Sequence, residues 1–188
     1  MKQWWLAALV IFLLLDCLLC LRWLHRRREH SQDAAIQAAS IRYRLDPALV
    51  KAVVWRESWF DPQARGRAGE IGLMQIRLPV AQEWANAEHW GSVPSAHFFD
   101  PVTNTLAGAW YLRKLLLRYR QADDPIPYAL ADYNAGRSRV QQWRKGSSGT
   151  NSQTFMQGIK FPGTRAYVQS ILRRYEHYRP IFPPEGKR

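Results

Sequence analysis

Cysteine is scarce in this sequence of 188 residues. Only Cys17 and Cys20 are present, and both lie in an apolar stretch near the N-terminus. This count excludes a disulfide-stapled fold and a cysteine-rich zinc module. None of the five histidines has a histidine partner at the i, i+4 spacing that a helical metal site needs. We therefore expect no metal and no cofactor.

Low-complexity sequence and strand-like alternation are also nearly absent. Hydrophobic residues make up 47% of the chain, and glycine and proline contribute 11 each. These fractions exclude a disordered or collagen-like chain. Apolar residues recur instead at helical spacing, and the length allows one folded domain of roughly 100–200 residues. The sequence predicts a mostly α fold over residues 31–180, followed by a flexible tail over residues 181–188.

Acidic side chains are few beside the basic ones, with 15 Asp and Glu against 27 Lys and Arg, for a net charge of +12. A basic surface attracts polyanions such as nucleic acid, anionic lipid or an anionic cell-wall polymer. The sequence contains no zinc-finger spacing, no basic region with heptads and no RNP-like motif. Nucleic acid is therefore not expected as a partner.

The N-terminal segment is the most apolar part of the chain. Residues 4–21 would form a helix about 27 Å long, close to the thickness of a bilayer core. Tryptophans stand at both ends, as in an interfacial belt. We predict that residues 1–30 form a membrane anchor with a single transmembrane helix, or an uncleaved signal segment. A cleaved signal peptide is the alternative, although its apolar region would be shorter and end at small residues.

Charge around this segment favours one orientation. Only Lys2 precedes the apolar run, whereas four arginines follow it within residues 22–28. By the positive-inside rule, this asymmetry would keep the rest of the chain in the cytoplasm.

Helix start signals recur along the domain. Asp46-Pro47 and Asp100-Pro101 each combine an N-cap carboxylate with proline at the first helical position. They predict one helix to about Ser58 and another of about five turns. Further helices are expected over residues 34–44, from Pro127 to the stop at Gly136, and over residues 164–177 with Thr164 as N-cap.

Glu57 is out of place in this pattern. At about 100° per residue, it falls on the same stripe of its helix as Val50 and Val53, which face the core. Burial and the negative end of the helix dipole both disfavour the carboxylate, so a raised pKa is expected. Such a residue suits a general acid near neutral pH. A structural ion pair, for example with Arg56, is the alternative.

Three further motifs carry groups that can contact a ligand, namely Gly72-Leu73-Met74-Gln75, Tyr133-Asn134-Ala135-Gly136 and Thr164-Arg165-x-Tyr167-Val168. Each has a simple structural explanation when taken alone. In this order and spacing after Glu57-Ser58, they resemble the catalytic domain of the soluble lytic transglycosylases (glycoside hydrolase family 23, related to goose-type lysozyme). The resemblance covers about residues 36–178.

The resemblance implies a lysozyme-like fold and cleavage of the β-1,4 bond between N-acetylmuramic acid and N-acetylglucosamine in peptidoglycan, leaving a 1,6-anhydro end. Because the sugar's own C6 hydroxyl attacks, one carboxyl group can act first as acid and then as base. That role would belong to Glu57. The resemblance further implies that the substrate-binding residues are Ser58, Met74, Gln75, Tyr133, Asn134 and Tyr167. Among the tryptophans, Trp59 is our candidate for a sugar-facing ring.

The chain departs from the family pattern at several positions. Gly66 stands where the family often has serine, and Glu70 where a small residue is common. Arg77 and Leu78 separate Ile76 from Pro79, and Gly163 replaces a glutamate. A lysozyme-type hydrolase is one alternative, and it would need a second carboxylate, for which Glu70 and Asp132 are the candidates. A non-catalytic peptidoglycan-binding domain is another.

A peptidoglycan substrate places the domain on the periplasmic or extracytoplasmic side of the inner (cytoplasmic) membrane, against the charge rule. We give the substrate argument more weight, since translocated domains sometimes override flanking charge. Glycan strands and the membrane, through residues 4–21, are then the expected partners, together with unspecified cell-wall or secretion machinery.

Overall fold

The computed structural model describes residues 2–186, apart from the side chains of residues 2, 3 and 5–8. Within this range the chain is helical, and its only extended pairing consists of isolated bridges of Ile71 with Arg65 and with Ile76. The elements in chain order are α1 (Lys2–His30), α2 (Asp33–Tyr43), α3 (Pro47–Ser58), α4 (Leu78–Ala87), the 3-10 turn η1 (Ser95–Phe99), α5 (Pro101–Arg118), α6 (Ile126–Ala135), α7 (Arg137–Trp143), η2 (Gly146–Gly149), α8 (Ser152–Gly158) and α9 (Pro162–Tyr178).

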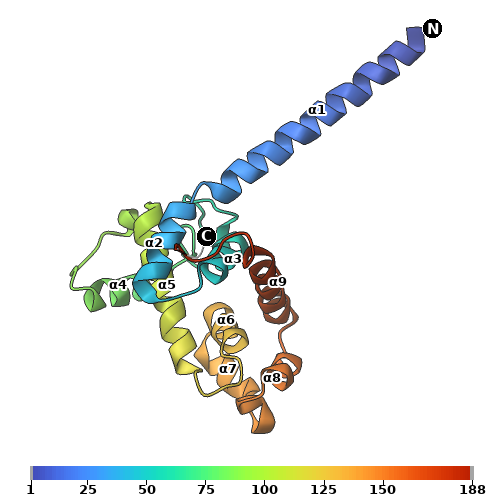
Figure 1. Ribbon diagram of the computed structural model, residues 1–188. Helices are drawn as coiled ribbons and strands as arrows, with labels where there is room; N and C mark the ends of the chain where they lie inside the picture. Colours follow the sequence, from blue (N-terminus) through green and yellow to red (C-terminus); the bar gives the residue numbers. More distant parts are fainter. Residues whose placement is uncertain (1, 187–188) are drawn as a thin grey trace.

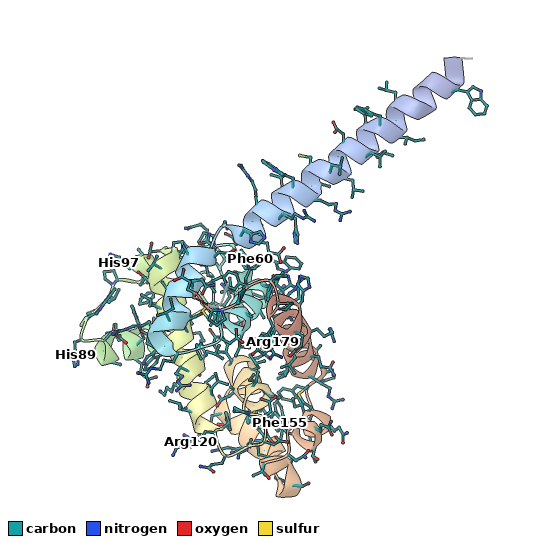
Figure 2. All side chains as sticks on the ribbon, in the orientation of Figure 1. Phe60, His89, His97, Arg120, Phe155 and Arg179 are labelled. Carbon is teal, nitrogen blue, oxygen red and sulfur yellow. The ribbon has the colours of Figure 1, made fainter. Side chains whose placement is uncertain are left out.

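The helix α1 leaves the domain as a single long rod with the N-terminus at its far end (Figure 1). Figure 2 shows side chains along much of the rod without neighbours from the domain, and the apolar residues from Leu9 to Leu24 are exposed. Among the described residues, no helix is both long and apolar enough to cross a bilayer. The transmembrane helix predicted over residues 4–21 is therefore not supported, although the side chains of residues 5–8 lie outside the description.

The C-terminal end of α1 is attached to the domain by polar contacts. The Tyr178 hydroxyl of α9 donates a hydrogen bond of 2.5 Å to the Glu29 carboxylate. Arg28 forms an ion pair of 3.1 Å with Asp61 in the loop after α3. These contacts fix where α1 leaves the domain.

Both Asp-Pro helix starts are confirmed. The Asp46 side chain accepts a hydrogen bond of 2.9 Å from the Ala48 amide at the start of α3, and Asp100 caps α5 in the same way through the Thr103 amide at 2.8 Å. The predicted cap of the last helix is wrong, because α9 begins two residues earlier at Pro162.

The helix α3 lies at the centre of the domain. It packs against α9 on one side and α2 on another, while α5 packs against α2 and α6. Val50, Val53 and Val54 of α3 are completely buried. The mostly α fold class is thus confirmed, and α3 is held on several faces, which makes it a rigid support for the residues at its C-terminal end.

The predicted flexible tail contains residues that contact the domain. Phe182 is only 4% exposed, and its ring lies 4.2 Å from the ammonium group of the buried Lys51. The carbonyl of Pro183 accepts a hydrogen bond of 3.0 Å from the Gln37 side chain. Residues 182 and 183 thus contact the domain, whereas Ile181 is exposed, and residues 187 and 188 lie outside the described part.

Candidate active site

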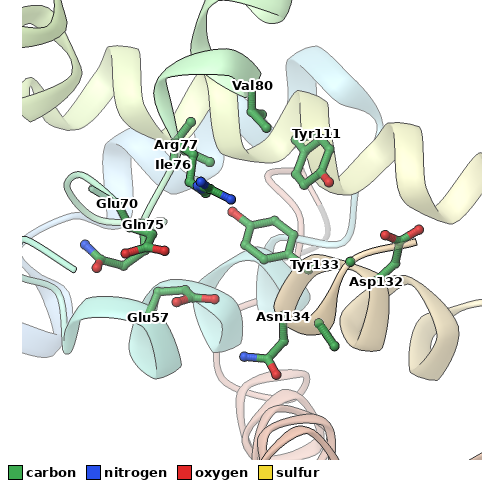
Figure 3. A pocket seen from close by; sticks show the side chains of 12 residues that line it. Glu57, Glu70, Gln75, Ile76, Arg77, Val80, Tyr111, Asp132, Tyr133 and Asn134 are labelled. Atoms are coloured by element: carbon green, nitrogen blue, oxygen red, sulfur yellow. The ribbon is translucent and has the colours of Figure 1, made fainter. Parts of the chain in front are cut away.

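Glu57 occupies the last turn of α3 and points into a pocket of about 480 Å³. Its carboxylate accepts a hydrogen bond from the Tyr167 hydroxyl of α9, so the packing of α3 against α9 sets the orientation of the acid. Figure 3 shows Glu57 on one wall of the pocket, with Tyr133 across from it. The lining residues are Glu57, Glu70, Gln75, Ile76, Arg77, Val80, Tyr111, Asp132, Tyr133, Asn134, Ala135 and Gly136.

The surroundings of Glu57 favour its protonated form near neutral pH. Burial, with a smaller contribution from the nearby Glu70 carboxylate, raises the pKa of the Glu57 carboxyl from its ordinary value of 4.5 to about 7. The Tyr167 hydrogen bond and the Arg56 guanidinium act in the opposite direction and are outweighed. Desolvation of the charged form is therefore the dominant cause, as the apolar stripe of α3 predicted.

Tyr167 is a buried hydrogen-bond donor behind the acid. Its side chain is 3% exposed, and burial together with the Glu57 charge raises the pKa of the phenol well above 10. The hydroxyl therefore keeps its proton and continues to donate to Glu57. Tyr167 does not line the pocket, so the structure places it against Glu57 rather than in the space open to a ligand.

The loop that carries Gly72-Leu73-Met74-Gln75 is held by one buried side chain of α5. The Asn104 amide group donates to the carbonyls of Ile71 (2.9 Å) and Phe98 (2.7 Å), and its oxygen accepts from the Met74 amide (2.8 Å). Gly72 has φ +72°, and a Cβ there would lie 2.4 Å from the Asn104 side chain. Glycine is therefore required for the loop to approach α5 this closely.

Gln75 ends this loop inside the pocket. Its backbone has φ +47°, which is uncommon for a residue with a side chain. The side-chain amide nitrogen of Gln75 donates to the backbone carbonyls of Gly72 (2.9 Å) and Ala64 (3.2 Å). The loop's own backbone therefore fixes this side chain. A residue that is held in an uncommon backbone conformation by several hydrogen bonds, next to an acid, is typical of a functional site.

Tyr133 joins α6 to the same loop. Its hydroxyl donates a hydrogen bond of 2.8 Å to the Met74 carbonyl, and its ring packs against Tyr111 of α5 with centroids 5.3 Å apart. The next residue, Asn134, is exposed in the pocket, and its side-chain oxygen accepts from the Thr164 hydroxyl at 2.9 Å. Gln75, Tyr133 and Asn134 thus lie in one pocket with Glu57.

Three other residues proposed from the sequence do not line this pocket. Ser58 is buried and donates to the Leu73 carbonyl at 2.8 Å, which ties α3 to the loop. Met74 is completely buried, with its side chain against Gly108 of α5. Trp59 is half exposed but packs against the rings of Trp55 and His25. The side chains of Ser58 and Met74 therefore face other protein groups, and Trp59 lies outside the lining of this pocket.

The two candidates for a second carboxylate differ sharply. Asp132 is buried, and its carboxylate binds the Arg118 guanidinium at 2.6 Å and the Tyr119 hydroxyl at 2.7 Å. It lies on the far side of Tyr133 from Glu57 (Figure 3). Glu70 is partly buried in the pocket lining and accepts a hydrogen bond of 2.9 Å from the Ala68 amide. Glu70 is therefore the second carboxylate that remains open to a ligand.

Comparison with known protein families identifies the family of this chain. Residues 34–156 match the family described as the transglycosylase SLT domain, and this stretch includes Glu57, the Gln75 loop and Tyr133. The chain belongs to the SLT domain family. The soluble lytic murein transglycosylase of Escherichia coli is 32% identical over 140 residues, which are 72% of this chain and 21% of that protein. Membrane-bound lytic murein transglycosylase F of Desulfosudis oleivorans is 35% identical over 109 residues, 56% of this chain and 22% of its own length.

Solved structures agree with this membership in the SLT domain family. The crystal structure of the 70-kDa soluble lytic transglycosylase from Escherichia coli is similar with a TM-score of 0.70 and 26% sequence identity, covering 78% of this chain and 24% of that one. The lysozyme-like fold expected from the motifs is thereby confirmed. The chain spans about a fifth of the length of the curated relatives it matches.

The sequence did not identify every residue that shapes the site of this SLT domain. Asn104 lies in an ordinary helical repeat, and only its three contacts with distant backbone reveal its role. Tyr111 and Val80 enter the pocket from α5 and α4, helices whose position relative to α3 depends on tertiary packing. A buried polar residue on an apolar helix face was the one available signal for Asn104.

Proposed function

We propose that this SLT domain is a peptidoglycan lytic transglycosylase that cleaves the β-1,4 bond between N-acetylmuramic acid and N-acetylglucosamine. The observation that carries the proposal is Glu57, an acid with a pKa of about 7 that faces a pocket of about 480 Å³. That volume lies within the range of small-ligand sites, roughly 300–1,000 Å³. The names of the relatives, all lytic murein transglycosylases, support the same substrate.

In the proposed reaction, protonated Glu57 donates its proton to the glycosidic oxygen while the bond from that oxygen to C1 of the muramic acid breaks. The C6 hydroxyl oxygen of the same sugar then bonds to C1, and its proton passes to the Glu57 carboxylate. The acid is restored, no water is consumed, and the product carries a 1,6-anhydro ring. A pKa of about 7 suits both steps, because the group must give and regain a proton.

The other pocket residues receive supporting roles in this proposal. Gln75, Tyr133 and Asn134 contact the sugars from the pocket lining, and Tyr167 orients the Glu57 carboxylate. Ser58 and Met74 act indirectly through the loop that they hold. A pocket whose donors and acceptors are fixed by backbone contacts orients a bound sugar without reorganisation during the reaction.

Mass spectrometry of the products tests the activity. The full chain is incubated with purified peptidoglycan sacculi, and the soluble fragments are expected to carry anhydro ends, each lighter by one water than a hydrolysed end. Hydrated reducing ends would instead support the lysozyme-type hydrolase, for which Glu70 is the available second carboxylate. Binding to sacculi without any soluble fragments would leave only a glycan-binding domain.

We also propose that α1 holds the domain at the outer face of the cytoplasmic membrane. The exposed apolar residues from Leu9 to Leu24 are a larger apolar surface than soluble domains normally leave uncovered. The substrate then requires the domain to be extracytoplasmic. The full chain is expected in the membrane fraction, and a C-terminal reporter is expected to signal from outside the cytoplasm. A cytoplasmic signal, or a soluble chain that has lost residues 1–30, would contradict this proposal.

A further inference from the structure

Glu70 fills the space that a side chain at residue 66 would need. A Cβ atom placed on Gly66 would lie 2.2 Å from the Glu70 carboxylate oxygen Oε2 and 2.8 Å from the Glu70 Cβ atom. Both distances are too short for any real contact. A serine at position 66 would therefore collide with both the carboxylate and the Cβ atom of Glu70.

The space next to Gly66 that Glu70 occupies borders the pocket beside Glu57. The same Cβ position on Gly66 lies 2.8 Å from Oε1 of Gln75, and Gln75 and Glu70 both line the pocket above Glu57 (Figure 3). The Gln75 amide nitrogen is committed to two backbone carbonyls, which turns Oε1 toward this volume. The Ala68 amide holds Glu70 Oε2 in place at 2.9 Å.

Two hydrogen-bond acceptors therefore face one region, and a ligand can supply the donor. In the described part of the chain, no side-chain donor reaches the Glu70 carboxylate, whose one hydrogen bond comes from a backbone amide. Acceptors in a partly buried site are costly to leave without partners. Sugars carry the missing groups as hydroxyl and acetamido N–H donors.

We propose that Glu70 is a substrate-binding residue of this site, which accepts a hydrogen bond from a hydroxyl or N–H of the sugar next to Glu57. This inference rests on the proposed function, since it assumes a glycan in the pocket. The contact would be made by a charged group. Charged acceptors form the stronger hydrogen bonds.

The charge of Glu70 also reaches Glu57. The groups that face Glu57 are Arg56 of α3, Tyr167 of α9, Tyr133 of α6 and Glu70 of the loop, and Glu70 raises the pKa of the Glu57 carboxyl. Replacing Glu70 by its neutral isostere removes a negative charge. The Glu57 pKa then falls, and activity that needs protonated Glu57 is lost at a lower pH.

Four full-length variants test the inference on sacculi, with kcat/KM measured across pH. Glu70→Gln is expected to lower kcat/KM about ten-fold, the effect of one hydrogen bond to a charged group, and to move the alkaline limb to lower pH. Gly66→Ser should lose activity because the serine collides with Glu70. The double variant Gly66→Ser with Glu70→Gly should recover part of the loss of Glu70→Gly, because the carboxylate and the Cβ atom of residue 70 are then both absent and a serine can occupy the volume.

The exposed Glu176 of α9 provides the matched control, and Glu176→Gln should behave as the unaltered chain. Glu70→Gln with kcat/KM within about two-fold of the unaltered chain and an unchanged alkaline limb would overturn the inference, whatever the folding of the other variants. If the unaltered chain releases no fragments, the proposed function fails instead. The affinity of Glu70→Gln for sacculi in a pull-down then decides the inference, with unchanged affinity counting against it.

Discussion

Glu57→Gln is expected to lower the rate of glycan cleavage by about 10²–10⁴-fold, the usual contribution of a positioned general acid. The amide has the shape of the carboxyl group but cannot give a proton to the glycosidic oxygen. Asp132 cannot replace it, because its carboxylate is held by Arg118 and Tyr119. The rate of fragment release from sacculi measures the effect.

Substrate binding separates this loss from a folding defect. The amide oxygen of Glu57→Gln can still accept the Tyr167 hydrogen bond, so sacculus binding and the melting temperature should stay near those of the unaltered chain. Glu176→Gln makes the same chemical change on an exposed residue that pairs with Arg179, and it should retain full activity. A cleavage rate of Glu57→Gln within ten-fold of the rate of the unaltered chain would show that Glu57 is not the general acid.

Asn104→Ala is expected to lower the free energy of unfolding by about 3–5 kcal/mol. The change leaves the Phe98 carbonyl and the Met74 amide without their partner, and each unsatisfied buried group costs about 1–3 kcal/mol. The Ile71 carbonyl loses one of its two hydrogen bonds and keeps the one from the Ile76 amide. The loop that presents Gln75 would also lose its attachment to α5. Activity should therefore fall even at temperatures where the domain remains folded.

Urea denaturation of the full chain measures this cost. Asn86→Ala is the matched control, because Asn86 is exposed on α4 and binds only the neighbouring Gln82 side chain. Its free energy of unfolding should change by less than about 0.5 kcal/mol. Equal small effects of the two substitutions would show that Asn104 does not hold the loop.

Much of the scaffold could be predicted because its signals are local. Asp46 and Asp100 each place a carboxylate before a helix that begins with proline, and both cap as expected. The partial burial of Glu57 followed from helical periodicity alone, because the stripe of valines on α3 faces the core. Local chemistry and periodicity were sufficient to predict a helix cap or the buried face of a helix, because these features depend on one helix alone.

The contacts between distant segments were not predictable in the same way. Tyr167 donates to Glu57 across 110 residues of sequence, and the motif order placed it in the site without showing what it binds. Trp59 was expected to face the sugar because aromatic rings often do, yet its backbone at φ +52° turns the chain at the end of α3 and sets the ring against α1. The close approach of Glu70 to Gly66 is likewise visible only in three dimensions.

The central claim is that Glu57 keeps its proton near neutral pH, and direct titration of its carboxyl group tests this most simply. Carbon-13 NMR of glutamate-labelled protein across pH, with Glu57→Gln used to assign the Glu57 signal, should give a midpoint near pH 7. A Glu57 midpoint near the ordinary glutamate value of 4.5 would contradict the account.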